Sequence, residues 1–295
     1  MSDFRLKVFQ SVAKNLSFTK ASQELFVSQL AITKHIQELE ATYQTRLFDR
    51  QGSKISLTES GRLLLEHCER ILEDYKRLEY EMHLLHNEYI GELKLGASTT
   101  IAQYVLPPLL GSFIGKFPQV NLSLLNGNSR EIEAALQEHR IDLGLVEGVF
   151  RLPNLKYTTF LEDELVAVVH SKSRLQLPEE ITPQDLPAIP LVLRERGSGT
   201  LDVIERSLQK HGVKLASLHV LMYLGSTESI KLFLENSDCM GIVSIRSICK
   251  ELAAGTFRVV EIKDMPMLRD FCFVQLQGQE GGLSQAFMNY MFMSR

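Results

Sequence analysis

The sequence predicts a multidomain α plus α/β protein, with an N-terminal winged helix-turn-helix, a long coiled-coil linker helix and a two-lobed α/β domain. Three observations predict this architecture. Two short amphipathic segments joined by a turn lie within residues 18–43. Apolar residues then follow a heptad pattern from residue 64 to residue 89. From residue 91 onward, short β-rich runs alternate with helical segments.

The two amphipathic segments have the pattern of a helix-turn-helix. The first is short and carries Phe18, Ala21, Ser22 and Leu25 on its apolar side. The second begins after Ser28, a candidate N-cap, and has one apolar stripe made of Ile32, Ile36, Leu39 and Tyr43. Its neighbouring face has no acid and consists of Gln29, Thr33, Lys34 and Gln37. Amides can pair with adenine edges and lysine can reach guanine or phosphate, although a solvated face on an ordinary helical hairpin has the same local pattern.

The surrounding residues favour the DNA-binding interpretation. In one order and with fixed spacing stand Phe9, Ser17-Phe18-Thr19, Ala21, Ser28-Gln29, Ala31-Ile32, Leu39-Glu40, Leu47-Phe48, Arg50, Leu57-Thr58 and Gly61. Together they resemble the N-terminal DNA-binding domain of the LysR-type transcriptional regulators, over about residues 4–65. The resemblance implies that DNA is contacted by Lys20, Ser28, Gln29, Leu30, Thr33, Lys34, Gln37, Arg50 and Lys54.

Three positions depart from the family pattern. Leu30 stands where the family usually has proline, Thr33 where it usually has serine, and Gln44 where a glycine commonly ends the recognition helix. Thr33 keeps the hydroxyl donor. Leu30 places an apolar group near the groove and can shift base preference, for instance toward a thymine methyl.

Residues 49–58 predict the wing, a small hairpin lying against the DNA backbone. Gly52-Ser53 is a turn signal, and Ile55 and Leu57 alternate as in a short strand. Arg50 and Lys54 would then contact phosphates, with plain surface charge as the alternative. The DNA-binding domain is therefore expected to span residues 1–58.

A linker and dimerisation helix is expected over residues 59–90. Thr58, Glu59 and Ser60 supply caps and an acid at its start. Its apolar residues recur at alternating spacings of four and three: Leu64, Cys68, Ile71, Tyr75, Leu78, Met82, Leu85 and Tyr89. This heptad pattern is typical of a two-stranded coiled coil, so a second copy would cover it and present two recognition helices to a palindromic site. Packing of the stripe onto the chain's own C-terminal domain is the alternative.

Composition limits the class of protein. The 295 residues are 44% hydrophobic and 23% charged, as in a globular protein of two or three domains. The N-terminus has no hydrophobic signal core and no apolar run could span a membrane, so we expect a cytoplasmic protein without membrane contact. Residues 1–60 hold eight Lys/Arg against six Asp/Glu, a charge of +2 within a chain of net charge −4. A weakly basic N-terminal segment followed by an acidic remainder of the chain fits a sequence-selective DNA-binding protein better than a general one.

The four cysteines give no metal site. Cys68, Cys239, Cys249 and Cys272 show no C-x-x-C spacing, and no histidine pair has metal-ligand spacing. We expect reduced packing residues, with a redox-sensing pair of Cys239 and Cys249 as a weaker hypothesis.

Residues 91–295 are expected to fold as a two-lobed α/β domain. Nine β-rich runs alternate with helical stretches, which predicts largely parallel sheets. Chain crossings are expected at residues 162–163 and 264–269, so that lobe one holds residues 91–162 and 268–295 and lobe two holds residues 163–267. The segments LPPLLGSF, IDLGLVEG, EDELVAVV and GSGT resemble the periplasmic-binding-protein-like effector domain of the LysR family, which implies a small effector between the lobes.

Three glycine- and hydroxyl-rich turns, each between a strand and a helix, are the candidate effector site, since such turns favour anions. They lie at residues 96–100, 197–200 and 225–227, and each hydroxyl could equally be an N-cap. The candidate residues are Ser98, Thr99, Thr100, Val146, Glu147, Ser198, Thr200, Ser226 and Thr227. Glu147 suggests that the effector, expected to be a small anionic metabolite, also carries an amine or hydroxyl. Arg194, Arg196 and Arg246 are candidate counter-charges, or members of surface salt bridges.

No catalytic residue, metal or cofactor is assigned. The sequence lacks G-x-S-x-G, H-E-x-x-H and G-x-G-x-x-G, and residues 111–117 fit a helix better than a phosphate loop. We therefore expect a LysR-type regulator that is not an enzyme. By resemblance it would form a homodimer and a homotetramer, with RNA polymerase left open as a further partner. The alternative is a two-lobed solute-binding protein or enzyme whose N-terminal helices only dimerise.

Overall fold

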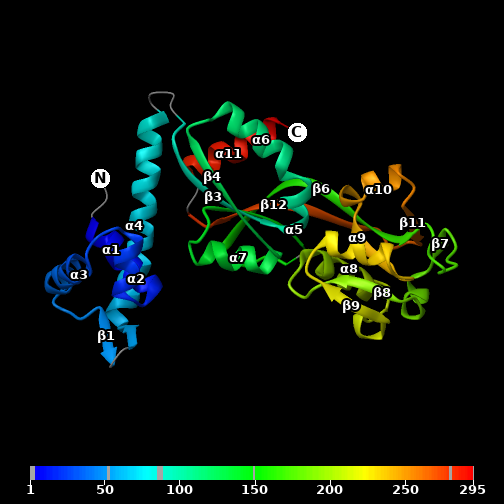
Figure 1. Cartoon of the computed structure of the whole chain (residues 1–295), viewed down its shortest axis with the longest axis horizontal. Coiled ribbons are helices and arrows are strands. Elements are labelled where there is room, and N and C mark those ends of the chain that lie inside the picture. The colour runs from blue at the N-terminus through cyan, green and yellow to red at the C-terminus, as the bar shows by residue number, and fades with distance from the viewer. Residues whose placement is uncertain (1–3, 52–53, 85–88, 149, 279–280, 295) are drawn as a thin grey trace. The chain divides into compact units, whose positions relative to one another are not determined.

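The chain folds into two compact units, residues 1–88 and residues 89–295 (Figure 1). The computed structural model describes residues 4–51, 54–84, 89–148, 150–278 and 281–294. Within these ranges, no helix combines the length and the apolar character that a membrane crossing requires.

The first unit is a winged helix-turn-helix, as predicted. The helix-turn-helix consists of α2 and α3, and the wing is the antiparallel hairpin β1–β2, in which Phe48 pairs with Leu57. Its elements are α1 (Phe4–Asn15), α2 (Phe18–Glu24), α3 (Gln29–Tyr43), β1 (Phe48–Gln51), β2 (Lys54–Leu57) and α4 (Glu59–Leu84).

The core of this unit explains much of the motif spacing in the sequence. Ile32, Ile36 and Leu39 of α3 are buried against α1 and α2, whereas Tyr43, the fourth member of the expected stripe, is 53% exposed. The Phe48 ring lies 5.5 Å from that of Phe9 and 5.9 Å from that of Phe18. These aromatic contacts fix β1 onto the helices, so the wing hairpin is attached to the same core as α3.

Helix α4 corrects one expectation about the heptad stripe. Cys68 belongs to the buried core of the first unit, its thiol donates to the Leu6 carbonyl at 3.3 Å, and the partly buried Leu64 packs against the same core. Cys68 is therefore covered by α1 and is not free to line a dimer seam, and Leu64 is only partly available for one. The exposed apolar positions begin further along, with Ile71, Leu78 and Met82. The division of the stripe into covered and exposed positions cannot be predicted from the sequence, because a heptad pattern shows that a stripe is apolar but not which neighbour covers it.

The C-terminal end of the predicted stripe also differs. Helix α4 ends at Leu84, and Leu85 lies outside the described residues. Tyr89 belongs to the second unit, where its ring lies 4.6 Å from that of Phe117. The predicted helix to residue 90 is therefore too long for the part that the structure describes.

The second unit is built on one hydrogen-bonded path of strands, in the order β4-β3-β5-β12-β6-β10-β8-β9, with β11 paired to β6 and β7 paired to β11. Its strands are β3 (Gly91–Ser98), β4 (Val120–Gly127), β5 (Leu143–Glu147), β6 (Leu155–His170), β7 (Glu180–Ile181), β8 (Leu191–Arg194), β9 (Val220–Leu224), β10 (Met240–Ser244), β11 (Phe257–Ile262) and β12 (Met267–Leu276). Its helices are α5 (Thr99–Tyr104), α6 (Leu106–Lys116), α7 (Ser129–Gln137), α8 (Gly199–Lys210), α9 (Thr227–Glu235), α10 (Cys249–Ala253) and α11 (Gly282–Met293).

Two long strands, β6 and β12, join the two lobes (Figure 1). The expected crossing at residues 162–163 lies inside β6, and the one at 264–269 leads into β12. The two strands run antiparallel to each other, with Asp163 opposite Arg269, so the sheet is mixed and not largely parallel as predicted. The reason is topological, because a chain that returns to the first lobe beside the strand on which it left must run in the opposite direction.

Strand alternation builds the core of lobe two. Leu165, Ala167 and Val169 of β6 pack on the α8 side, whereas Val168 packs on the α9 side. Because successive side chains of a strand point to opposite faces, both faces of β6 are buried, and the run LVAVV is apolar throughout.

Lobe one has the same layered design. Helices α6 and α11 lie on one face of its strands and α7 lies on the other (Figure 1). Phe113 and Phe287 join α6 to α11 with ring centroids 5.0 Å apart, and Ile132 of α7 packs with Val146 and Val274 on the opposite face. Helices therefore cover both faces of the strands of lobe one.

Candidate functional site

The first candidate surface is the N-terminal half of α3. Ser28 is the N-cap, and its hydroxyl accepts from the Ala31 amide at 3.2 Å. This cap starts the helix at Gln29, so the residues that follow project into solvent. Exposed side chains here are those of Ser28, Gln29, Leu30, Lys34 and Gln37, together with Lys20 of α2. Leu30 is 80% exposed and Phe26, in the turn, 95%, so this polar surface also carries two apolar groups.

Two details bear on the predicted base contacts. The Thr19 hydroxyl donates to the Gln29 side-chain oxygen at 3.3 Å, which orients that amide. Thr33 is half-buried, and its hydroxyl donates to the Gln29 carbonyl at 2.9 Å, so its proton is engaged by its own helix. The side chains of Arg50 and Lys54 lie outside the described part of the structure, although their backbones form β1 and β2.

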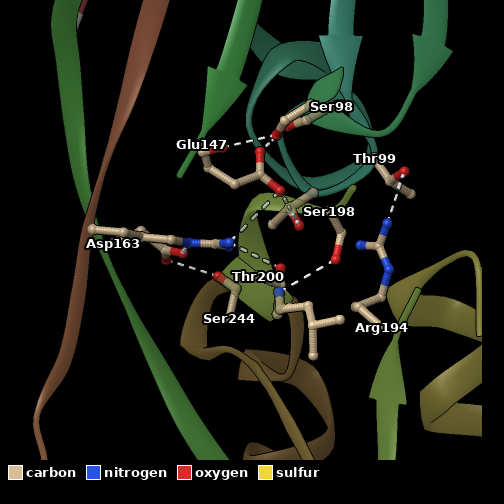
Figure 2. A network of polar contacts seen from close by, with 12 residues as sticks. Ser98, Thr99, Glu147, Asp163, Arg194, Ser198, Thr200 and Ser244 are labelled. Carbon is tan, nitrogen blue, oxygen red and sulfur yellow. Dashed lines mark hydrogen bonds and ion pairs between the residues drawn. The ribbon is translucent and has the colours of Figure 1, made fainter. Parts of the chain in front are cut away.

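The second candidate site is a buried polar network at the junction of the two lobes (Figure 2). Glu147 ends β5, and its carboxylate accepts from the hydroxyls of Ser98 and Thr100, the latter at 3.4 Å. Ser98 occupies the N-cap position of α5 but makes no side-chain cap hydrogen bond, so its hydroxyl serves Glu147 instead. Two of the predicted hydroxyls and the predicted acid therefore meet, although they come from residues almost fifty positions apart.

Arg269 of β12 ties this cluster to the other lobe. Its Nη1 lies 3.6 Å from Glu147 Oε1 and donates to the Thr200 hydroxyl at 2.9 Å. Its Nε donates to Asp163 Oδ2 at 2.8 Å, and the Ser244 hydroxyl donates to the other oxygen of Asp163 at 2.7 Å. Arg269, Asp163 and Ser244 are all buried, so this is a shielded ionic network and not a surface salt bridge.

Arg194 approaches the network from β8 (Figure 2). It is 1% exposed, and its guanidinium donates through Nε and Nη2 to Glu195 at 2.8 and 3.0 Å. The same Nη2 lies 3.4 Å from the Thr99 hydroxyl of lobe one. Arg194 thus spans the junction. Of the other two candidate counter-charges, Arg196 is exposed, whereas Arg246 is partly exposed and lies 3.6 Å from Asp163.

The remaining predicted effector residues have more local roles. The Ser198 hydroxyl accepts from the Leu201 amide and caps α8 beside the network. Ser226 caps α9 by accepting from the Ser229 amide at 3.1 Å, while Thr227 is buried at the start of that helix. The side chain of Val146 packs into the core of lobe one, as the alternation of β5 requires, since Glu147 points the other way.

Sequence reasoning missed three members of the network: Asp163, Arg269 and Ser244. The sequence places the first two at the predicted chain crossings, without any part in a site. It offers little signal for Asp163, because this residue stands between Glu162 and Glu164 in a segment of mixed apolar and charged residues, where charges are ordinarily exposed.

The lobes also contact each other directly around the network. The Tyr104 hydroxyl of α5 donates to Glu228 of α9, and burial is the largest factor raising the pKa of Tyr104. A Cβ on Gly199 would lie 2.0 Å from the Glu147 carbonyl oxygen, so only glycine allows α8 to start so close to β5.

The described residues contain no group of three or more side chains suited to holding a metal ion. Of the four cysteines, Cys68, Cys239 and Cys272 are buried and Cys249 is exposed. Burial raises the pKa of Cys239, which lowers its thiolate fraction. Burial of Cys239 therefore gives no support to the hypothesis of a Cys239–Cys249 redox pair.

Comparison with known proteins identifies the family of this chain. Residues 4–62 match the bacterial regulatory helix-turn-helix protein family, lysR type, and residues 86–292 match the LysR substrate binding domain. The chain is 34% identical over 258 residues to the uncharacterized HTH-type transcriptional regulator YeiE of Escherichia coli (strain K12), an alignment that covers 88% of this chain and 85% of that protein.

Two solved structures are similar. One is the regulatory domain of Synechocystis PCC6803 CcmR in complex with 2-PG, with a TM-score of 0.62 and 28% identity, covering 69% of this chain and 97% of that chain. The other is full-length CbnR with its target DNA, with a TM-score of 0.63 over the whole of both chains; at 22% identity it supports the fold alone. Both family matches follow the two structural units, and together they span most of the sequence. The chain therefore belongs to the LysR family of bacterial helix-turn-helix transcriptional regulators.

Proposed function

We propose that this chain is a cytoplasmic transcriptional regulator that binds a specific DNA site as a dimer and is controlled by a small anionic metabolite between its lobes. The observation that carries the DNA-binding part is the exposed, acid-free N-terminal half of α3. Its amides and lysine match base edges and phosphates, and the oriented Gln29 amide is the best placed base reader. Family membership counts against the alternative of a solute-binding protein or enzyme.

The DNA-binding proposal is tested with a site obtained by in vitro selection from random duplexes. Gln29→Ala should weaken binding to that site by about 1–3 kcal/mol and binding to random DNA far less, because one bidentate base contact is lost. Gln209→Ala, an exposed glutamine on α8, is the matched control. Arg50→Ala should weaken both DNAs and lower the salt dependence by about one unit. Equal losses on both DNAs for Gln29→Ala would contradict its role as a base reader, and selection without sequence preference would contradict the function.

The dimer is proposed from α4. The exposed residues of its heptad stripe, Ile71, Leu78 and Met82, are spaced by seven and four positions and stand between charged residues. A second copy of α4 would cover them as a coiled coil. Leu78→Glu should shift the full-length protein toward monomer in analytical ultracentrifugation, whereas the neighbouring Glu79→Gln should not. A homotetramer is also proposed, with support from exposed apolar residues on the two edge strands: Leu124 and Leu125 of β4 and Leu221, Met222 and Tyr223 of β9.

Effector control is proposed from the buried network. Hydroxyls of Ser98, Thr99 and Thr100 from lobe one and Thr200 from lobe two converge there with Arg194 and Arg269. The complex of CcmR with 2-PG shows that a relative of this domain binds a small molecule. Thermal unfolding of the full-length protein against small anions tests this, since ligand at 100 times its dissociation constant adds about 2.7 kcal/mol. A stabilisation that is lost in both Thr100→Val and Thr200→Val would support the junction site, and one unaffected by either change would place the ligand elsewhere.

A further inference from the structure

The charges buried at the lobe junction are not evenly compensated. Arg269 faces two carboxylates, but its Nε lies 2.8 Å from Asp163 whereas its Nη1 lies 3.6 Å from Glu147. Asp163 also accepts a hydrogen bond from Ser244 and lies 3.6 Å from Arg246. Arg194, the other buried guanidinium, is held by both oxygens of Glu195. Glu147 is therefore the acid with the weakest cationic partner.

Charged and polar groups from several elements surround Glu147. Strand β12 contributes Arg269, β6 contributes Asp163 and β8 contributes Arg194. Helix α5 contributes hydroxyls, α7 contributes the Ser129 hydroxyl, which donates to the Glu147 carbonyl at 2.8 Å, and α8 contributes the backbone of Gly199. Burial has the largest influence and raises the pKa of Glu147. The positive charges of Arg269 and Arg194 lower this pKa, and the negative charge of Asp163 raises it. The net effect of these groups is a pKa of Glu147 above its ordinary value, so its carboxyl holds a proton more tightly than an exposed glutamate does.

Two guanidinium nitrogens at the same junction have no partner among the described residues. They are Arg194 Nη1 and Arg269 Nη2, and both belong to side chains that are at least 95% buried. Figure 2 shows Arg194 turned toward the network from the side opposite Asp163. Leaving a buried N–H without an acceptor costs free energy, so such atoms are suited to a ligand that supplies oxygens.

We propose that an oxoanion group of the effector binds the free nitrogens of Arg194 and Arg269, and that Glu147 carries a proton in the bound state. The inference rests on the effector site proposed above and specifies its chemistry. An anion placed on these guanidinium groups brings a negative charge close to Glu147, and two adjacent negative charges in a buried site are strongly unfavourable. Protonation of Glu147 removes that repulsion.

The affinity for the anion should fall as pH rises. An anion bound near Glu147 raises the affinity of this carboxyl for its proton, so the proton-binding constant is higher with ligand than without it. By linkage, the ligand binds more weakly as pH rises between the two values, by at most about tenfold per pH unit for one proton. Sulfate is a suitable probe because its charge stays constant in this range, whereas inorganic phosphate itself titrates.

The experiment measures sulfate binding to the full-length protein by calorimetry between about pH 6 and pH 9. The wild type should bind sulfate more weakly at the alkaline end, whereas Glu147→Gln, which mimics the protonated acid, should bind with nearly constant affinity. Arg194→Lys should lose at least tenfold in affinity. Arg196→Gln, an exposed arginine two positions away, is the matched control and should behave like the wild type.

A second readout needs no ligand. Because a raised pKa makes the folded protein hold its proton more tightly than the unfolded chain, the wild type should lose stability relative to Glu147→Gln as pH rises. Identical pH profiles for the two proteins, or sulfate binding that does not depend on pH in the wild type, would overturn the role of Glu147. If sulfate, inorganic phosphate and 2-PG all fail to bind at any pH, the anion site is wrong, while selective DNA binding would still support the regulator.

Discussion

Arg269 Nε lies 2.8 Å from Asp163 Oδ2, and neither side chain has any exposed surface. The two residues stand opposite each other on β12 and β6, the strands that connect the lobes. Removing one member of a buried pair leaves the other charge uncompensated, whereas exposed pairs contribute little. The pair therefore stabilises the junction only as long as both partners are present.

Asp163→Asn should accordingly destabilise the second unit by about 3 kcal/mol, since Glu147, at the longer distance, would be the remaining carboxylate near Arg269, beside the neutral Thr200 hydroxyl. Urea unfolding of the full-length protein measures this. Glu138→Gln, which removes an exposed partner of Arg140, is the control and should change stability by about 1 kcal/mol at most. Equal effects of the two substitutions would show that the junction pair is no more important than a surface pair.

Gly61→Ala should destabilise the first unit by about 1–3 kcal/mol or more. A Cβ at this position would lie 2.1 Å from the Leu47 carbonyl oxygen, so α4 would have to move away from the wing. Gly111→Ala is the control, because a Cβ there meets no atom within 4 Å and the residue lies inside α6. It should stabilise the second unit by about 1 kcal/mol, the difference in helix propensity. Circular dichroism during thermal unfolding checks both.

Gln44→Gly should stabilise the first unit by about 0.5–1 kcal/mol. Gln44 ends α3 with φ 51 and ψ 35, the left-handed conformation that glycine adopts without steric cost. The gain is partly offset by the greater freedom of glycine in the unfolded chain. A fall in the unfolding midpoint would show that the exposed Gln44 side chain makes a contact that outweighs the backbone strain.

Alkylation of the native protein with iodoacetamide at mildly alkaline pH should modify Cys249 first. Cys249 is exposed, whereas Cys68 is buried and its pKa is raised to about 12, first by burial and then by Glu69. Below that pH Cys68 stays protonated, and the thiol form does not react. Peptide mass spectrometry would show Cys68 modified only after denaturation. Early modification of Cys68 would mean that α1 and α4 separate readily.

Several features of the fold could be predicted because they depend on nearby residues. The N-cap at Ser28 and the buried stripe of Ile32, Ile36 and Leu39 follow from local spacing, and the structure has them. The first half of β6 could not be recognised, because residues 155–164 mix apolar and charged side chains without the continuous apolar run of the second half. That segment becomes a strand through its pairing with β12, which is more than a hundred positions away.

For the candidate site, the sequence predicts several of the residues, but only the structure shows which of them contact each other. Ser98, Thr100, Glu147 and Thr200 were singled out by their turns and strand ends, and all four enter one network. Ser226 was singled out by the same reasoning but serves as a cap for α9. A glycine- and hydroxyl-rich turn looks the same in both cases, since its neighbours in space are not encoded in its own sequence.

The sequence by itself determined the family, the helix-turn-helix with its exposed polar face, and the alternation of strands and helices, because periodicity and capping act within a few residues. The tertiary structure alone decided which charges are buried. Arg269 meets Thr200 from 69 positions away and Asp163 from 106 positions away, and Arg194 meets Thr99 from 95 positions away. A charged side chain can be buried only where such distant partners compensate its lost hydration, so its place inside or outside is a property of the whole fold.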